Sequence, residues 1–356
     1  MDCDVLCLDL DFTLVRYIEP AFTELMYRVL GQAMVSRGYS DMLLEPLWVR
    51  RALEFTQNGL VADLRTGNLM SLGKECEVMA CFYGFTARTE EEIRMIYGDP
   101  PHFPISPTHR IPGQYWCFLT HFAIMETALY SACIELLARH HSTKSLSELE
   151  TDLYASVLEI FDTPLGQATD QSFYTELYRY PGKYIHTERR LPELLKALGK
   201  TLVVVTNSYA EFTEFVCSYA LGKDWKAMFD FVVVGAGKPH YFEEGIEGKR
   251  LESGWMLGGS HRDLLQRYPG KSFAFVGDHF LNDVAAPKQY LNWPAIAIIS
   301  ELETEPLSPA PAYFSHFGSF VREENYWINF VLENAARVQQ SLESVLELLL
   351  RSEVVS

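Results

Sequence analysis

Short runs of apolar residues, each bounded by polar or glycine residues, recur near the start of the chain and across its second half. They are Val5–Leu10, Thr201–Val205, Phe231–Val234, Phe273–Val276 and Ala295–Ile299. Continuous apolar runs of this length are typical of parallel strands that are buried on both faces. Stretches with helical spacing separate the last four runs, among them Glu211–Tyr219 and Ser260–Tyr268. The alternation predicts an α/β fold with a doubly wound parallel sheet.

A long insertion separates the first predicted strand from the second. The two lie about 190 residues apart, far more than one crossover connection requires. Residues 18–184 are therefore predicted to form an inserted domain, and residues 1–17 and 185–305 to form the core. The insertion is predicted to be mostly helical, because apolar residues recur at three- and four-residue spacing. The stretches with this spacing are Pro20–Arg37, Ile124–Ala138 and Leu146–Phe161.

The last segment, residues 306–356, is predicted to hold a proline-rich join followed by one helix of about 25 residues with a heptad seam. The apolar residues of the seam are Ile328, Val331, Ala335, Val338, Leu342, Val345 and Leu349. Such a seam either packs on the chain's own core or joins two copies of the chain. A homodimer through this helix or through the inserted domain stays open.

Polar residues follow four of the predicted strands at their carboxyl ends, where ligands bind in open α/β sheets. In chain order they are Asp9, Asp11, Thr206, Asn207, Lys238, Asp278 and Asp283. Two carboxylates about 5 Å apart repel each other by roughly 3 kcal/mol at an effective dielectric of 20. Mg²⁺, a hard cation that prefers oxygen ligands, would relieve this repulsion, and Lys238 would add a positive charge against a phosphate. Each motif alone is more often a turn or a helix cap, but together they indicate phosphoryl transfer.

The motifs DLDFT, TNS, the lysine of GKP and GDHFLND resemble, in this order, the four motifs of the haloacid dehalogenase (HAD) superfamily. The long insertion resembles that superfamily's cap between motifs one and two. More narrowly, the chain resembles the cytosolic purine 5′-nucleotidases and 5′-nucleotidase-domain-containing proteins over most of residues 1–303. The segments that carry this resemblance include GLVADLRTGNLMSL (Gly59–Leu72), METALYSACIE (within Phe122–Glu135) and LGGS (Leu257–Ser260).

The resemblance implies a role for each candidate site residue. Asp9 would be the nucleophile that forms an aspartyl-phosphate, and Asp11 would serve as general acid and then as general base. Mg²⁺ would be held by Asp9, the backbone carbonyl of Asp11 and Asp278, with Asp283 in support. The residues that would hold the phosphate are Thr206, Asn207 and Lys238.

The insertion departs from these relatives where they contact the nucleobase. Their Phe-Asn pair is matched by Phe122 followed by Ala123, and their later Arg and His have no clear match near Thr151–Thr163. Phe122 is therefore either a substrate contact or part of the core of the insertion. Three functions stay open: a Mg²⁺-dependent 5′-nucleotidase, a phosphatase of another small phosphorylated metabolite, and a scaffold or regulatory member of the family with little turnover.

Composition narrows the expected partners and location. The net charge of −17 argues against a broad nucleic-acid surface and against binding to anionic membranes, but it leaves room for a small phosphorylated substrate. No apolar run approaches the ~18 residues of a membrane helix, and the acidic N-terminus does not resemble a secretory signal. Seven scattered cysteines without a CxxC pair predict reduced thiols in a cytoplasmic protein.

Overall fold

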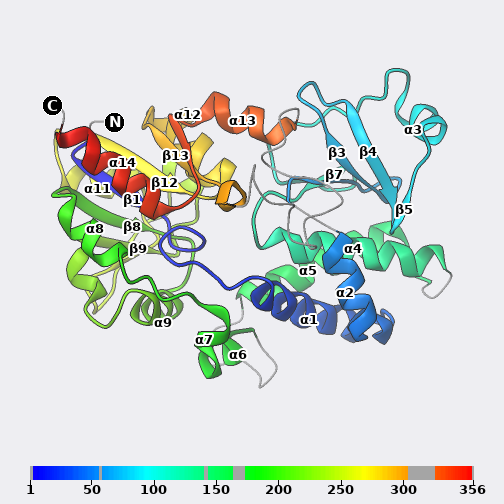
Figure 1. Ribbon diagram of the computed structural model, residues 1–356, viewed down its shortest axis with the longest axis horizontal. Helices are drawn as coiled ribbons and strands as arrows, with labels where there is room; N and C mark the ends of the chain where they lie inside the picture. The colour runs from blue at the N-terminus through cyan, green and yellow to red at the C-terminus, as the bar shows by residue number, and fades with distance from the viewer. Residues whose placement is uncertain (1–2, 56–57, 140–142, 163–172, 304–324, 355–356) are drawn as a thin grey trace. The chain divides into compact units, whose positions relative to one another are not determined.

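A computed structural model describes the chain apart from residues 1–2, 56–57, 140–142, 163–172, 304–324 and 355–356. The chain divides into two compact units (Figure 1). The first unit comprises Met1–Ile18, Tyr184–Glu303 and Phe330–Ser356. The second comprises Glu19–Lys183 and Thr304–Asn329.

The first unit is built on an eight-stranded sheet of order β10-β11-β9-β8-β1-β12-β13-β14. All five predicted strands are present, as β1 (Val5–Leu8), β8 (Thr201–Val205), β9 (Phe231–Val234), β12 (Phe273–Gly277) and β13 (Ala295–Ile298). They pair in parallel, with β1 between β8 and β12. The edges carry β11 (Met256–Leu257), antiparallel β10 (Lys249–Arg250) and β14 (Arg337–Gln339). This mostly parallel sheet confirms the predicted α/β class.

Burial explains why these five runs form the centre of the sheet. The side chains of Val5, Leu6, Cys7 and Leu8 are all fully buried, because both faces of β1 are covered. Removing such side chains from water stabilises a strand by roughly 1.5–3 kcal/mol each. The connections carry α8 (Leu191–Ala197), α9 (Ala210–Ala220), α10 (His240–Glu243), α11 (His261–Arg267) and α12 (Ala286–Leu291).

The second unit holds more helix than strand, as predicted, and also an antiparallel sheet that the sequence did not predict. The predicted helices are present as α1 (Ala21–Ser36), α4 (Ala123–Ala138) and α5 (Leu146–Asp162), and the unit also holds α2 (Pro46–Phe55), α3 (Glu90–Tyr97), α6 (Phe173–Arg179) and α7 (Pro181–Tyr184). Beside them lies a six-stranded antiparallel sheet of order β5-β4-β3-β2-β7-β6. Its strands are β2 (Val61–Asp63), β3 (Asn68–Leu72), β4 (Val78–Tyr83), β5 (Thr86–Ala87), β6 (Arg110–Ile111) and β7 (Tyr115–Cys117). Strands of two to six residues are too short to show a clear period of two.

The motif GLVADLRTGNL forms the hairpin of β2 and β3 and is held together by its own polar side chains. Asp63 is fully buried, and its Oδ1 accepts a hydrogen bond from the backbone N–H of Arg65 at 3.1 Å. Its Oδ2 accepts hydrogen bonds from Thr66 Oγ1 at 2.8 Å and from the Tyr97 hydroxyl at 3.1 Å. Gly67 completes the turn with a φ of +77°, which glycine adopts without strain. The motif therefore has a structural role within its own unit.

The prediction of a single helix near the C-terminus was wrong. The segment forms α13 (Tyr326–Asn334), then β14, then α14 (Leu342–Val354). β14 pairs in parallel with β13, where Ala336 N–H donates to the Ala295 carbonyl at 2.8 Å. The exposed hydrogen-bonding groups at the edge of β13 are satisfied in this way, which one continuous helix would not do.

The apolar residues of α14 are covered by the chain itself. Leu342, Val345 and Leu349 are buried, and α14 packs against α8. Arg190, at the start of α8, forms ion pairs with Glu343 and Glu347 of α14. Packing within the chain therefore buries the seam residues of α14, and no second copy of the chain is needed to cover them.

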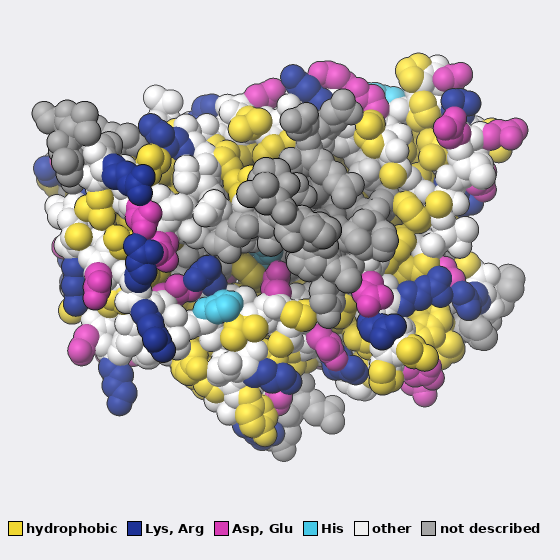
Figure 2. All heavy atoms as spheres, viewed as in Figure 1, with side chains coloured by type: hydrophobic (Ala, Val, Ile, Leu, Met, Phe, Trp, Pro, Cys, Tyr) yellow, Lys and Arg dark blue, Asp and Glu magenta, His cyan; other side chains and the backbone are white. Residues whose placement is uncertain are grey.

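None of the described helices combines the length and the apolarity that a membrane span needs. All seven cysteines are described, all are free thiols, and all except Cys76 are buried. They act as small apolar side chains. On the face seen in Figure 2, Lys and Arg side chains are interspersed with Asp and Glu.

Replacement of Leu346 by Ala tests the packing of α14. Leu346 is fully buried, so we expect its truncation to lower the free energy of unfolding by about 2–5 kcal/mol in urea titrations. The matched control is Leu332→Ala on α13, where the leucine is 61% exposed and the expected change is below about 1 kcal/mol. Equal effects of the two substitutions would contradict this packing.

Candidate active site

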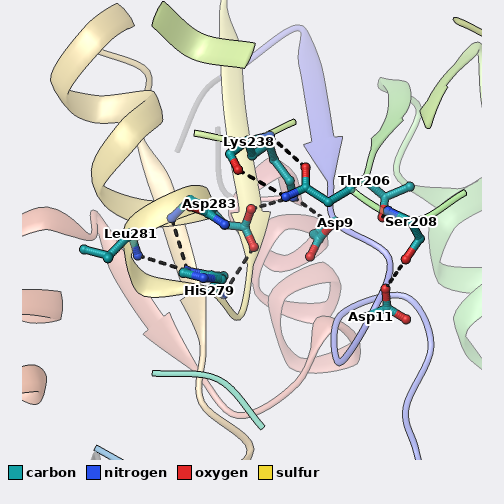
Figure 3. Close-up of polar contacts among 10 residues, drawn as sticks. Asp9, Asp11, Thr206, Ser208, Lys238, His279, Leu281 and Asp283 are labelled. Atoms are coloured by element: carbon teal, nitrogen blue, oxygen red, sulfur yellow. Dashed lines mark hydrogen bonds and ion pairs between the residues drawn. The ribbon is translucent and has the colours of Figure 1, made fainter. Parts of the chain in front are cut away.

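Three buried carboxylates meet at the carboxyl edge of the central strands. Figure 3 shows two of them, Asp9 and Asp283, with Lys238 between them. Asp9 follows β1 and Asp278 follows β12, while Asp283 lies on the π-helical turn Phe280–Ala285. One oxygen from each of the three carboxylates lies within 4.8 Å of the others. The structure therefore brings these predicted site residues together at a spacing that a single metal ion can span.

Lys238 lies among these carboxylates and pairs with two of them. Its Nζ donates to Asp9 Oδ1 at 2.7 Å and to Asp283 Oδ1 at 2.6 Å, and its side chain is 2% exposed. Burial by itself disfavours the ammonium, but the attraction of Asp283 and Asp9 outweighs this and raises the pKa of Lys238 above its ordinary value. Lys238 therefore carries a positive charge at neutral pH.

One ammonium does not balance three carboxylates. Burial, together with repulsion from Asp283, raises the pKa of Asp9 to about 7 despite the contact with Lys238. Burial and the charges of Asp9 and Asp283 raise the pKa of Asp278 well above its usual range. With all three ionised, two negative charges remain uncompensated. A divalent cation with oxygen ligands matches both the charge and the donor atoms, so the residues present fit a Mg²⁺ ion.

Asp11 has different partners from the other carboxylates. Its Oδ1 accepts a hydrogen bond from the Tyr17 hydroxyl at 2.5 Å, and its Oδ2 accepts one from Ser208 Oγ at 2.6 Å. Burial, with the charge of Asp9, raises the pKa of Asp11 to about 6, while the two hydroxyl groups oppose the rise. A carboxyl group with this pKa can both release and accept a proton near neutral pH.

The two polar residues after β8 are placed differently. Thr206 is buried, and its Oγ1 accepts a hydrogen bond from the backbone N–H of Ser208 at 3.0 Å. The amide of Asn207 binds the backbone of Lys238 twice, donating to its carbonyl at 3.1 Å and accepting from its N–H at 2.7 Å. In this structure Asn207 positions the loop that carries Lys238.

Two residues that the sequence did not single out as site residues position Asp283. The backbone N–H of His279 donates to Asp283 Oδ2 at 3.2 Å, and its Nδ1 accepts from the backbone N–H groups of Leu281 and Asn282 at the start of the π-helical turn. A Cβ atom at Gly277 would lie 2.4 Å from Asp283 Oδ2, so only glycine fits there. In the sequence, the glycine of GDHFLND was the signal that pointed to this part of the site.

Phe122 precedes α4 in the second unit and packs among aromatic side chains of that unit. Its ring centroid lies 5.9 Å from that of Phe22 and 5.5 Å from that of Phe161, in edge-to-face arrangements. The next residue, Ala123, is buried. These contacts give Phe122 a packing role within its own unit, and its contact with substrate stays a prediction.

Comparisons of the sequence with a family model and with curated proteins agree on one family. A family model described as "5′ nucleotidase family" matches residues 2–309. The 5′-nucleotidase domain-containing protein 1 of Homo sapiens is 27% identical over 331 residues, which cover 84% of this chain and 72% of the human protein. Its Bos taurus counterpart is 26% identical over 330 residues, covering 84% and 73%. Among solved structures, L-2-haloacid dehalogenase from Xanthobacter autotrophicus is 11% identical, with 98% of each chain covered and a TM-score of 0.35.

The raised pKa of Asp9 predicts how the stability of the metal-free protein depends on pH. Between pH 3.8, the ordinary pKa, and about pH 7, the folded chain retains a proton that the unfolded chain has released. The contribution of Asp9 to the free energy of unfolding therefore falls as pH rises through this range, by up to about 1.4 kcal/mol for each pH unit.

Urea titrations at pH 5 and pH 7.5 in the presence of EDTA measure this change. The Asp9→Asn variant lacks the titrating group, so we expect it to lose less stability between the two pH values than the unsubstituted protein. Identical pH dependence in the two proteins would rule out the proposed titration.

Proposed function

The chain belongs to the 5′-nucleotidase family of HAD-like phosphoric monoester hydrolases, and we propose that it hydrolyses nucleoside 5′-monophosphates with Mg²⁺ through an aspartyl-phosphate on Asp9. The observation that carries the proposal is the cluster of Asp9, Asp278 and Asp283 around one buried ammonium. A site with an excess of negative charge binds a phosphate only if cations compensate it. The cluster offers oxygen ligands for such a cation, and Lys238 lies beside Asp9, the residue that would be the nucleophile.

The proposed reaction has two steps, with Asp9 and Asp11 in different roles. In the first, a carboxylate oxygen of Asp9 forms a bond to phosphorus, the bond from phosphorus to the 5′-oxygen breaks, and Asp11 gives its proton to that oxygen. In the second, Asp11 takes a proton from a water molecule that attacks the aspartyl-phosphate. This step restores Asp9 and releases inorganic phosphate.

The cation and the phosphate would be held by residues already described. Asp9, Asp278 and the backbone carbonyl of Asp11 would bind Mg²⁺, with Asp283 in support. The ion would compensate charge on the phosphoryl oxygens. Lys238 would contribute a second positive charge, and Thr206 would hold the phosphate. We assign Asn207 two roles. It would help to hold the phosphate, and its amide holds the backbone of Lys238.

The identity of the substrate rests on the family and on the second unit. We propose that residues 18–184 form a cap that selects a small phosphorylated substrate, with a nucleotide as the first candidate. The second candidate is another phosphorylated metabolite, favoured by Ala123 where the purine nucleotidases have Asn. A scaffold with little turnover is less well supported, because Asp9, Asp11 and Lys238 are all kept. The free thiols support a cytoplasmic location.

A phosphate-release assay tests this function. Nucleoside monophosphates and sugar phosphates are incubated with the protein in Mg²⁺ or in EDTA, and inorganic phosphate is measured. We expect turnover of at least one substrate in Mg²⁺ and its loss in EDTA. The Asp9→Asn variant should be slower by at least about a thousandfold, because it lacks the nucleophile. Metal-independent turnover, or full activity in Asp9→Asn, would contradict the proposal.

A further inference from the structure

Both carboxylate oxygens of Asp11 are engaged by hydroxyl groups that the mechanism above does not use. Tyr17 donates to Oδ1 at 2.5 Å, and Ser208 donates to Oδ2 at 2.6 Å. Figure 3 shows Ser208 directed at Asp11 from the segment that follows β8. Tyr17 approaches from a second segment, six residues further along the chain than Asp11. Because each oxygen has its own donor, rotation of the carboxylate about its Cβ–Cγ bond would break both hydrogen bonds.

The backbone between Asp11 and Tyr17 folds back on itself, which allows the two side chains to meet. Val15 N–H donates to the Leu10 carbonyl at 2.9 Å, and Val15 also forms a bridge with Asp11. Phe12, at the bend, has a φ of +53°, an uncommon conformation for a bulky residue. Its ring centroid lies 5.0 Å from that of Tyr17. The tyrosine ring is thus packed as well as hydrogen-bonded.

Tyr17 is also anchored by the segment through which the chain returns to the first unit. Tyr17 pairs with Ile185 in an antiparallel bridge. On either side of it, Ile18 N–H donates to the Tyr184 carbonyl at 2.8 Å and His186 N–H donates to the Arg16 carbonyl at 3.0 Å. The outgoing and returning segments therefore form one short two-stranded ribbon.

A partly buried ion pair stabilises the same ribbon. The guanidinium of Arg16 donates to both oxygens of Glu188, at 2.8 Å and 3.1 Å, and the Glu188 side chain is 7% exposed. Two parallel hydrogen bonds of this kind fix direction as well as distance. The position of the Tyr17 hydroxyl is therefore set by the residues on both sides of it.

We propose that Tyr17 is a positioning residue that, together with Ser208, holds the Asp11 carboxyl in the orientation needed for proton transfer to the leaving oxygen. The inference rests on the proposed phosphatase function. Hydroxyl groups suit a residue that alternates between acid and base, because they donate to a carboxylate and accept from a carboxylic acid. A lysine or arginine in their place could only donate and would hold Asp11 in its ionised form.

The leaving group of the substrate provides a readout that general damage to the fold would not produce. A nucleoside 5′-monophosphate releases an alkoxide that needs a proton from Asp11. The 4-nitrophenolate released from 4-nitrophenyl phosphate is stable without one. For both substrates kcat/KM reports transfer of the phosphoryl group to Asp9, provided that this transfer is the first irreversible step.

The test compares kcat/KM for these two substrates in the full-length protein with Mg²⁺. For Tyr17→Phe we expect a fall of about ten- to a hundredfold with the nucleotide and less than about threefold with 4-nitrophenyl phosphate. Ser208→Ala should show the same selectivity. The matched control is Tyr241→Phe, which removes a hydroxyl that is buried in the same unit and makes no hydrogen bond with any residue that the structure describes. This control variant should leave kcat/KM unchanged for both substrates.

The possible results separate this inference from the function on which it rests. Equal losses for both substrates would overturn the positioning role, because they would show only a structural defect. An unchanged Tyr17→Phe variant would overturn it as well. If the unsubstituted protein hydrolyses neither substrate, the proposed function fails and the inference fails with it. Turnover by the unsubstituted protein combined with a selective loss in Tyr17→Phe would support both.

Discussion

The structure of the site depends on the contact of the Lys238 ammonium with Asp9 and Asp283. Several carboxylates are held in a region from which water is largely excluded, and their repulsion would otherwise oppose folding. The positive charge of Lys238 offsets part of that repulsion, and the rest of the negative charge is uncompensated. The negative charge that remains suits a divalent cation, through which we propose that the site binds a phosphate.

The topology of the sheet makes this contact attainable. Lys238 and Asp9 are separated by 229 residues, yet they come from loops at the same edge of one parallel sheet. The larger segment of the second unit, Glu19–Lys183, lies between them in the chain. The insertion does not disturb the site, because the sheet holds β1 between β8 and β12 wherever the intervening chain goes.

Asp9 and Asp11 are separated by one residue, yet their different surroundings give them different chemical properties. Asp9 faces a cation and other carboxylates, whereas Asp11 faces two hydroxyl groups. The first environment suits a nucleophile and metal ligand, and the second suits a group that gives and takes a proton. The turn at Phe12 and the ribbon at Tyr17 create this difference.

The sequence by itself determined the five core strands and the order of the charged residues at their ends, because both are local. Buried parallel strands require continuous apolar runs, and the residue after a strand reaches the sheet edge whatever the rest of the chain does. Only the tertiary structure decided the sheet of the second unit, the insertion of β14 between two helices, and the partners of Asn207, His279 and Tyr17. Short strands and single hydrogen bonds leave no periodic pattern, and they form only when distant segments come together to satisfy backbone and side-chain groups.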